Sequence, residues 1–318
     1  MPFDRAREYL ERFEKIKVSE TMIRETVERC GKALVRHEDL AVKRAAVQLL
    51  PRNAPENKEE QVKNGNFYLQ MDGAFIPIID RANGGMRSYV ENKLAVGFYE
   101  KDILRSGKQC VVSNKRFAIS PLPGVSHFEM RVRKMAIDRN VRNASRVIVV
   151  SDGAVWIDKM RERQFPDSVH ILDWYHAKEK LYETAHLLFK ENQKAVYEWA
   201  KPLESLLWIG QARRVCSILM RQMKANENDR TKLAPLYKYY RRRISKMRYD
   251  EFRAAGFIIG SGAVESANKY LVAGRLKQSG MKWNLSGAHA ILKLREKIFD
   301  ETWDSTWRNR NTQFLYAV

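Results

Sequence analysis

Two aspartates follow predicted strands in positions that could support metal-dependent chemistry. Asp152 comes just after residues 147–150, a run of β-branched apolar residues typical of a central strand buried on both faces. Ligands bind at the carboxyl ends of strands in open α/β sheets, so a carboxylate there is a candidate for catalysis. Asp72 follows a strand predicted at 66–71. Simpler alternatives stay open, because Asp152 could cap the next helix and Asp72-Gly73 could form a hairpin turn.

The net charge of +20 is concentrated in three segments. Residues 131–146 carry six Lys/Arg against one Asp, 201–253 carry fourteen against five acids, and 260–297 carry seven against two. Such concentration is the footprint of a polyanionic partner, most often nucleic acid. A basic membrane-binding helix explains this concentration of charge less well, because no segment combines its charge with a bulky apolar face that has no other role.

Composition limits the class of protein. With 318 residues and 44% hydrophobic content, the chain is long enough for two or three domains and a sizeable core. No stretch reaches the roughly 18 apolar residues of a membrane span, and no signal peptide is recognisable. Cys30, Cys110 and Cys216 lie far apart without a CxxC pair, which argues against a disulfide framework and a cysteine zinc site. We expect a reduced, cytoplasmic protein without membrane contact.

Hydrophobic periodicity predicts the elements that position the two aspartates. Residues 3–15 and the stretch after Ser19, a good N-cap, predict two helices, either a helix-turn-helix or an ordinary helical hairpin for dimer packing. Strands are predicted at 66–71, 75–79 and 94–99, and their short connections imply an antiparallel meander. An edge strand near 110–119, a basic helix at about 128–143 and a strand at 169–172 ending at Asp173 complete the pattern.

This order of elements is similar to that of the ribonuclease H-like fold, in which the ends of the first and fourth strands lie side by side. On that topology Asp72 and Asp152 become neighbours. Beyond 174 the chain is predicted to be helical to about 250, with breaks near Pro202 and between 226 and 231. Three tyrosines within residues 237–240 directly precede three arginines, Arg241, Arg242 and Arg243. We interpret 191–257 as an inserted helical domain that contacts DNA; the alternative is a solvated basic helix face.

A specific resemblance lies in the C-terminal third. The segment IGSGAVESANKYLVAGRLKQSGMKW at 259–283 closely resembles the corresponding block of bacterial insertion-sequence DDE transposases of the ISKra type. YLQMDG at 68–73, VIVVSDGAVWI at 147–157 and ILDWYHAKEKL at 171–181 match that family's pattern in order, and 18–34 looks like its preceding helical segment. The resemblance covers most of residues 18–300 and is weak in the predicted insertion.

The resemblance implies that Asp72, Asp152 and Glu265 are the catalytic acids and the metal ligands. The fold would be α/β, a ribonuclease H-like mixed sheet with an all-α insertion and N-terminal helices. Two Mg²⁺ or Mn²⁺ ions roughly 4 Å apart would activate the attacking oxygen and stabilise the leaving oxygen, with Asp72 bridging them. Asp173 and His176 match a pattern that this family shares with Mutator-like transposases. We interpret them as a structural or DNA-positioning pair, because no cysteine or second histidine has zinc-site spacing.

The resemblance also implies the domains and the partners. The domains would be an N-terminal helical region (1–50), a linker (51–65), a catalytic domain (66–190 and 258–302), the inserted domain (191–257) and a C-terminal tail (303–318). Besides the three arginines, four further basic residues would flank the scissile strand: Lys269, Arg275, Lys277 and Lys282. Trp283 could stack on a flipped base or lie in the core. Double-stranded DNA, as transposon ends and target, would be the partner of a nucleoid-associated homo-oligomer.

Three functions are compatible with these observations. The expected one is a DDE transposase that catalyses strand cleavage and strand transfer of an insertion sequence. Its rival is a transposase-derived DNA-binding protein that no longer cuts; the presence of all three acids favours the first. A ribonuclease H-like nuclease or resolvase would share the fold and the metals but would not need a basic inserted domain.

Overall fold

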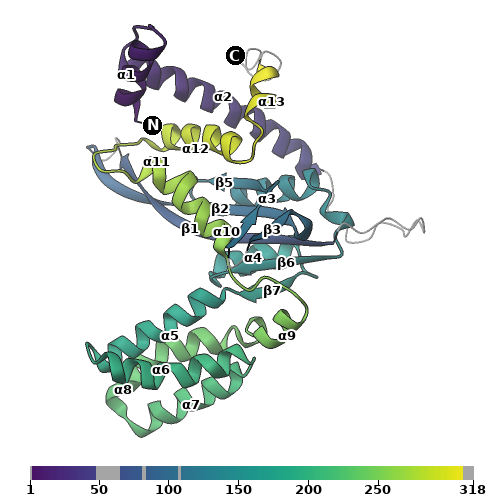
Figure 1. The fold of residues 1–318 in the computed structure, drawn as a ribbon, viewed down its shortest axis with the longest axis vertical. Helices are drawn as coiled ribbons and strands as arrows, with labels where there is room; N and C mark the ends of the chain where they lie inside the picture. Colours follow the sequence, from purple (N-terminus) through teal and green to yellow (C-terminus); the bar gives the residue numbers. More distant parts are fainter. Residues whose placement is uncertain (1, 48–64, 81–83, 107–108, 311–318) are drawn as a thin grey trace, which may run out of the picture. The chain divides into compact units, whose positions relative to one another are not determined.

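The computed structural model describes residues 2–47, 65–80, 84–106 and 109–310 of the chain. They form an α/β protein with a mixed five-stranded sheet of order β5-β2-β1-β6-β7 (Figure 1). The strands of this sheet are β1 (Asn66–Asp80), β2 (Met86–Tyr99), β5 (Arg116–Ser120), β6 (Arg146–Ser151) and β7 (Val169–Leu172). The predicted linker at 51–65 lies, apart from Gly65, outside the described residues, as does the end of the predicted tail.

The chain divides into two compact units. Unit 1 comprises Met1–Val147, Arg163–Phe165 and Gly262–Val318, and unit 2 comprises Ile148–Glu162 and Pro166–Ser261. The predicted N-terminal helical region therefore belongs to the same unit as β1, β2 and β5. None of the described helices combines the length and the apolar character needed to cross a bilayer.

The central feature of unit 1 is a long antiparallel hairpin of β1 and β2. Its register runs from Phe67 opposite Tyr99 to Asp80 opposite Met86. The prediction that the first strand ends in a turn at Asp72-Gly73 was wrong: β1 continues through both residues, and the segments predicted at 66–71 and 75–79 are one strand. Gly73 lacks the positive φ that a type I′ turn requires. The third antiparallel strand is β5, which pairs with β2. A separate two-stranded sheet contains β3 (Ile103–Ser106) and β4 (Gln109–Val112).

The helices of unit 1 come from both ends of the chain. They are α1 (Phe3–Phe13), α2 (Glu20–Val47), α3 (Ser126–Asp138), α10 (Gly262–Ala267), α11 (Gly274–Leu276), α12 (Leu285–Phe299) and α13 (Trp303–Arg308), with a π-helical turn at Asn268–Ala273 and 3-10 turns at Glu100–Asp102 and Val141–Asn143. The predicted N-cap is confirmed, because the Ser19 hydroxyl accepts a hydrogen bond from the Met22 N–H at 3.1 Å. Helix α2 lies against α12 (Figure 1). A Cβ on Gly31 would lie 2.4 Å from the Ala290 carbonyl oxygen, so the close approach requires glycine.

Buried ion pairs connect three helices of unit 1. Arg131 on α3 pairs with Glu38 and, at 2.9 Å, with Asp39, both on α2. Lys293 on α12 pairs with Glu38 and, at 2.6 Å, with Glu296. Removing one partner would leave an uncompensated buried charge, so these pairs specify how α2, α3 and α12 fit together.

Unit 2 contains most of β6, the parallel strand β7 and a set of helices. These are α4 (Val155–Gln164), α5 (Trp174–Phe189), α6 (Gln193–Trp208), α7 (Ala212–Ala225), α8 (Glu227–Arg241) and α9 (Tyr249–Ala254), with a 3-10 turn at Ile244–Lys246. The break predicted at Pro202 was wrong, since Pro202 lies inside α6. Burial of Val196, Ala200, Leu203 and Leu207 along one face of α6 outweighs the hydrogen bond that proline cannot make. The chain bends instead at Gly210, whose φ is +73°.

Candidate active site

Within unit 1, strand β1 is tied directly to the helix that carries Glu265. Gln70 and Asp72 are two residues apart on β1 and share one face of the sheet. The buried Gln70 Oε1 accepts hydrogen bonds from the N–H groups of Ala263 (3.0 Å) and Val264 (3.2 Å), in the first turn of α10. The Asn268 Nδ2 donates to Asp72 Oδ2 at 2.6 Å. Both ends of α10 are therefore anchored to the strand that carries Asp72.

Glu265 lies between these two anchors. It is exposed, it occupies the first turn of α10, and it precedes Asn268 by three residues, so the two side chains share a helix face. The helix dipole stabilises a carboxylate at this position. Because Asn268 contacts Asp72, Glu265 and Asp72 are presented by one framework within unit 1.

Several polar atoms beside Asp72 have no hydrogen-bond partner in the described part of the chain. They are both amide atoms of the fully buried Asn92 and the Oδ1 of Asn268. Asn92 pairs with Ala74 and therefore shares the sheet face of Asp72. Asn268 also begins the π-helical turn, a form often found at functional sites. Orphaned amides next to a carboxylate fit a hydrated cation, whose waters would supply the missing hydrogen bonds.

In unit 2, Asp152 and Asp173 follow the carboxyl ends of adjacent parallel strands. Ser151 of β6 and Leu172 of β7 are the last register pair, and the Asp173 N–H donates to the Ser151 carbonyl at 2.8 Å. Asp152 Oδ1 accepts from the Ala154 N–H at 2.9 Å, so the capping alternative is realised by one carboxylate oxygen. The other oxygen, Oδ2, has no hydrogen-bond donor among the described residues and is available to a ligand.

Asp173 is fully buried and is held as a carboxylate. It caps α5 by accepting from the Tyr175 N–H at 2.9 Å, and it also accepts from the Ser261 hydroxyl and, at 2.8 Å, from His176 Nδ1. Burial alone would raise the pKa of Asp173, but the hydrogen bonds from His176, Ser261 and Tyr175 lower it below its ordinary value. With the proton on Nδ1 of His176, Nε2 is the ring nitrogen that could ligate a metal, as in carboxylate–histidine–metal arrangements.

The loop after Asp152 is fixed by residues from the end of α8. Gly153 has a φ of +81°, and a Cβ there would lie 2.2 Å from Arg243 Nε. Arg243 donates to the Gly153 carbonyl and, at 3.0 Å, to the Tyr239 carbonyl, while the Tyr239 hydroxyl donates to the Asp152 carbonyl at 2.7 Å. Arg241 and Arg242 are exposed. The three arginines predicted to bind DNA therefore differ in role. Arg243 forms hydrogen bonds inside unit 2, whereas Arg241 and Arg242 face solvent.

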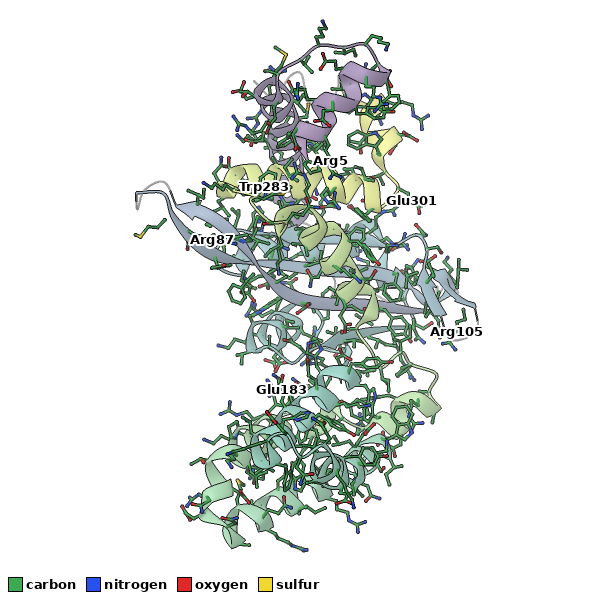
Figure 2. The ribbon with its side chains drawn as sticks, turned by 60° about the vertical axis from the view of Figure 1, so that its left-hand side comes forward. Arg5, Arg87, Arg105, Glu183, Trp283 and Glu301 are labelled. Atoms are coloured by element: carbon green, nitrogen blue, oxygen red, sulfur yellow. The ribbon has the colours of Figure 1, made fainter. Side chains whose placement is uncertain are left out.

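The basic residues near Glu265 also divide into two groups. Three of them are exposed: Lys269, Lys277 and Lys282. Arg275 is only 5% exposed, and its guanidinium lies 4.6 Å from the Phe3 ring centre and 4.7 Å from that of Trp283. Trp283, labelled in Figure 2, is itself buried, which matches the core alternative. Arg275 thus packs between Phe3 and Trp283, and its burial keeps it from the surface where DNA would bind.

Asp173 and His176, both in unit 2, could each offer one ligand atom to a metal ion. This pair differs from the predicted ligands, which are Asp72, Asp152 and Glu265. Its mixed oxygen and nitrogen donors suit Mn²⁺ or Zn²⁺ better than Mg²⁺, which prefers oxygen alone.

Sequence reasoning missed the polar residues that hold the acids. Gln70 interrupts the apolar strand two residues before Asp72, so a period of two places both on one face. That signal was available in the sequence. Asn268 follows Glu265 at helical spacing, but its bond to Asp72 is a long-range contact that no local pattern encodes. Ser261 and Asn92 likewise gave no local signal.

No protein-family model matches this chain, and no curated protein matches it in sequence.

Proposed function

We propose that this protein is a metal-dependent DNA strand transferase of the DDE transposase type. The arrangement of Gln70, Asp72 and Asn268 carries the proposal. Through these side chains, the helix that bears Glu265 is anchored on the strand that bears Asp72. Asp72 and Glu265, which are 193 positions apart in sequence, are thereby held on one framework. An acid that only faces solvent does not need such anchoring.

The order of the sheet supports a ribonuclease H-like assignment. Three antiparallel strands are followed by two parallel strands, in the order β5-β2-β1-β6-β7. Strand β1 carries Asp72, and β6, its neighbour in this order, ends just before Asp152. We propose that Asp72, Asp152 and Glu265 act together on one scissile phosphate.

The proposed chemistry follows from these three carboxylates as metal ligands. Divalent ions, when bound, would favour deprotonation of the attacking water or 3′-hydroxyl and neutralise charge on the phosphate. Asp72, Asp152 and Glu265 would hold the ions through hard oxygens. The carboxylate of Asp173 orients His176, whose ring could position the DNA strand or provide a further ligand. The exposed cations described above would bind the flanking phosphates without reading sequence.

Cleavage of DNA that carries the element's own ends, with Mg²⁺ present or omitted, tests the proposal. Glu265→Gln removes one ligand charge at nearly constant volume, so nicking should fall by about 100-fold or more while DNA affinity stays within about twofold. Glu227→Gln is the matched control, since Glu227 is an exposed acid in the first turn of α8, and it should cut like the parent. If Glu265→Gln nicks as fast as the parent, the catalytic assignment is wrong and the DNA-binding rival is favoured.

Two further variants decide which residues hold the metal. Asp72→Asn should abolish Mg²⁺-dependent nicking, whereas His176→Ala should slow it without changing the metal content of the purified protein. Stoichiometric zinc that disappears in His176→Ala would instead assign the tight metal site to Asp173 and His176. Full activity of Asp72→Asn would remove Asp72 from the site.

A further inference from the structure

The distal part of the β1–β2 hairpin exposes aromatic side chains that unit 1 does not cover. Phe75 on β1 is 61% exposed and Tyr89 on β2 is 59% exposed. β5 pairs with β2 only at residues 93–97, so the part of β2 from Met86 to Asn92 lies beyond that pairing. Single exposed apolar residues scattered over a protein surface are normal, but exposed aromatic residues this close together on a two-stranded ribbon indicate a binding surface.

The register places these side chains on one face. Phe75 is opposite Glu91, Pro77 is opposite Tyr89, and Ile79 is opposite Arg87. Directly opposite residues of an antiparallel pair point to the same side, and so do residues two apart. One face of the ribbon therefore presents Phe75, Tyr89 and Arg87 in a row.

Positive charge accompanies the aromatic rings. The Arg87 guanidinium lies 5.5 Å from the Tyr89 ring centre, and no carboxylate of the described residues pairs with it. Figure 2 shows Arg87 on this part of the hairpin. Glu91 is the one acid on the described face, and Lys93 neutralises it at 2.9 Å.

The segment between α11 and α12 adds a second cation. It runs beside the end of the hairpin (Figure 1), where the Ile79 N–H donates to the Trp283 carbonyl at 2.7 Å. The exposed Lys282 therefore lies one residue from the edge of β1. Pro77, two residues before Ile79, faces the same edge, where its missing N–H is tolerated.

We propose that this distal hairpin face, formed by Phe75, Tyr89 and Arg87 with Lys282 at its edge, binds unpaired DNA bases. Aromatic rings accept any base by stacking, and the neighbouring cations attract the backbone, which together make the usual platform for single-stranded nucleic acid. An aliphatic protein partner would not need rings interleaved with cations. About 10 Å of extended strand separates Phe75 from Asp72, and the two side chains point to opposite faces of β1. The bound bases would therefore lie on the other side of the hairpin from the proposed cleavage site.

Binding without any metal ion tests this proposal separately from cleavage. An oligonucleotide duplex with a short unpaired stretch containing 2-aminopurine would be titrated with the parent, and with the Phe75→Ala/Tyr89→Ala variant. The parent should bind it more tightly than the fully paired duplex and change the probe's fluorescence. The variant should bind the unpaired stretch at least about tenfold more weakly and lose the fluorescence change. Its affinity for paired DNA should change by less than about twofold.

Leu104→Ala/Val111→Ala is the matched control, because these residues face each other on the β3–β4 hairpin and are 57% and 56% exposed. It should bind like the parent. Phe75→Leu/Tyr89→Leu removes the rings but keeps apolar bulk. It should show the same loss of binding to the unpaired stretch, and it replaces the alanine variant as the test if that variant folds poorly. Equal binding by the parent and the leucine variant would overturn the proposal. So would a change of oligomeric state with no change in DNA binding, which would assign the face to contact between copies.

Discussion

At the scale of single residues, three adjacent arginines are expected to differ in role. Replacing Arg241 and Arg242 by alanine should lower DNA affinity across sequences and leave the unfolding free energy within about 0.5 kcal/mol, because both are exposed. Arg243→Ala should lower the unfolding free energy by about 1–3 kcal/mol, because it removes a guanidinium that satisfies the Gly153 and Tyr239 carbonyls. Urea unfolding and filter binding on both variants measure the two effects.

The cleavage assay adds a second contrast between these variants. Arg243→Ala should slow nicking at saturating DNA, since the loop after Asp152 loses its support, whereas Arg241→Ala/Arg242→Ala should recover nicking at high protein concentration. Arg243→Lys keeps the charge but not the forked geometry, and it should behave like Arg243→Ala. Identical stability of Arg243→Ala and the parent would show that Arg243 does not hold the loop.

The carboxylates were predictable at this scale, but most of their partners were not. Asp152 and Asp173 each end a short apolar strand, a local pattern that β6 and β7 confirm. The bond from Ser261 to Asp173 joins residues 88 positions apart, and the bond from Asn268 to Asp72 joins residues 196 apart. No local periodicity encodes such contacts.

At the scale of elements, the anchor of α10 on β1 should matter for both stability and activity. Gln70→Ala removes the buried acceptor of two N–H groups in the first turn of α10, so the unfolding free energy should fall by about 1–3 kcal/mol. Nicking should fall further than this loss explains, because the helix that carries Glu265 then keeps only the Asn268 anchor to β1. Thermal unfolding and nicking at a temperature where all variants are folded measure these quantities.

Asn284→Ala is the matched control for Gln70→Ala. The Asn284 side chain caps α12 by accepting from the Gly287 N–H at 2.6 Å, and its loss should cost about 1 kcal/mol. This variant should be destabilised but should nick like the parent once folded. If both variants lost nicking in the same proportion to stability, Gln70 would have no positioning role.

Elements were predicted best where local pattern and tertiary packing agree. The apolar runs at β6 and β7 and the Ser19 cap of α2 were found, because each carries a local signal that packing reinforces. The turn signal of Asp72-Gly73 failed, since pairing with β2 over the whole hairpin outweighs it. The proline signal at 202 failed in the same way, because one apolar face of α6 is buried along its length.

At the scale of the whole molecule, buried histidine should make folding sensitive to acid. Burial lowers the pKa of His289 from 6.5 to about 3, and the nearby charges of Arg131, His127 and Lys293 add to the effect. The unfolded chain binds a proton below about pH 6.5, but the folded chain does so only near pH 3. The contribution of His289 to the free energy of unfolding is therefore fully present above pH 6.5 and is lost as the pH falls. The loss is about 3 kcal/mol at pH 4.

Unfolding measured in urea at pH 7 and pH 4 checks this expectation. His289→Leu should lose about 3 kcal/mol less than the parent between the two pH values, because the titrating side chain is gone. His186→Leu, at an exposed position on α5, should follow the parent. Buried His170 in unit 2, whose pKa is also lowered to about 3, should leave part of the acid sensitivity in both variants. An unchanged loss in His289→Leu would show that His289 does not contribute.

The distribution of positive charge sets how the whole molecule should bind DNA. Of the residues predicted to contact phosphates, five are exposed cations: Arg241, Arg242, Lys269, Lys277 and Lys282. Each phosphate contact releases a counterion and adds about −0.9 to the slope of log K against log salt. If all five make contacts, the slope is about −4.5, and affinity falls steeply between low and physiological salt.

Removing part of this charge should change the slope by a defined amount. Lys277→Ala/Lys282→Ala eliminates two contacts, so the slope should become shallower by about 1.8, and binding should weaken equally for different DNA sequences. Lys101→Ala/Arg105→Ala removes the same charge from exposed positions outside the three basic segments, and Figure 2 shows Arg105 on β3. This control should keep the parent's slope, because net charge alone does not release counterions from DNA. Equal changes of slope in both variants would mean that binding follows total charge, and the proposed contact surface would then be wrong.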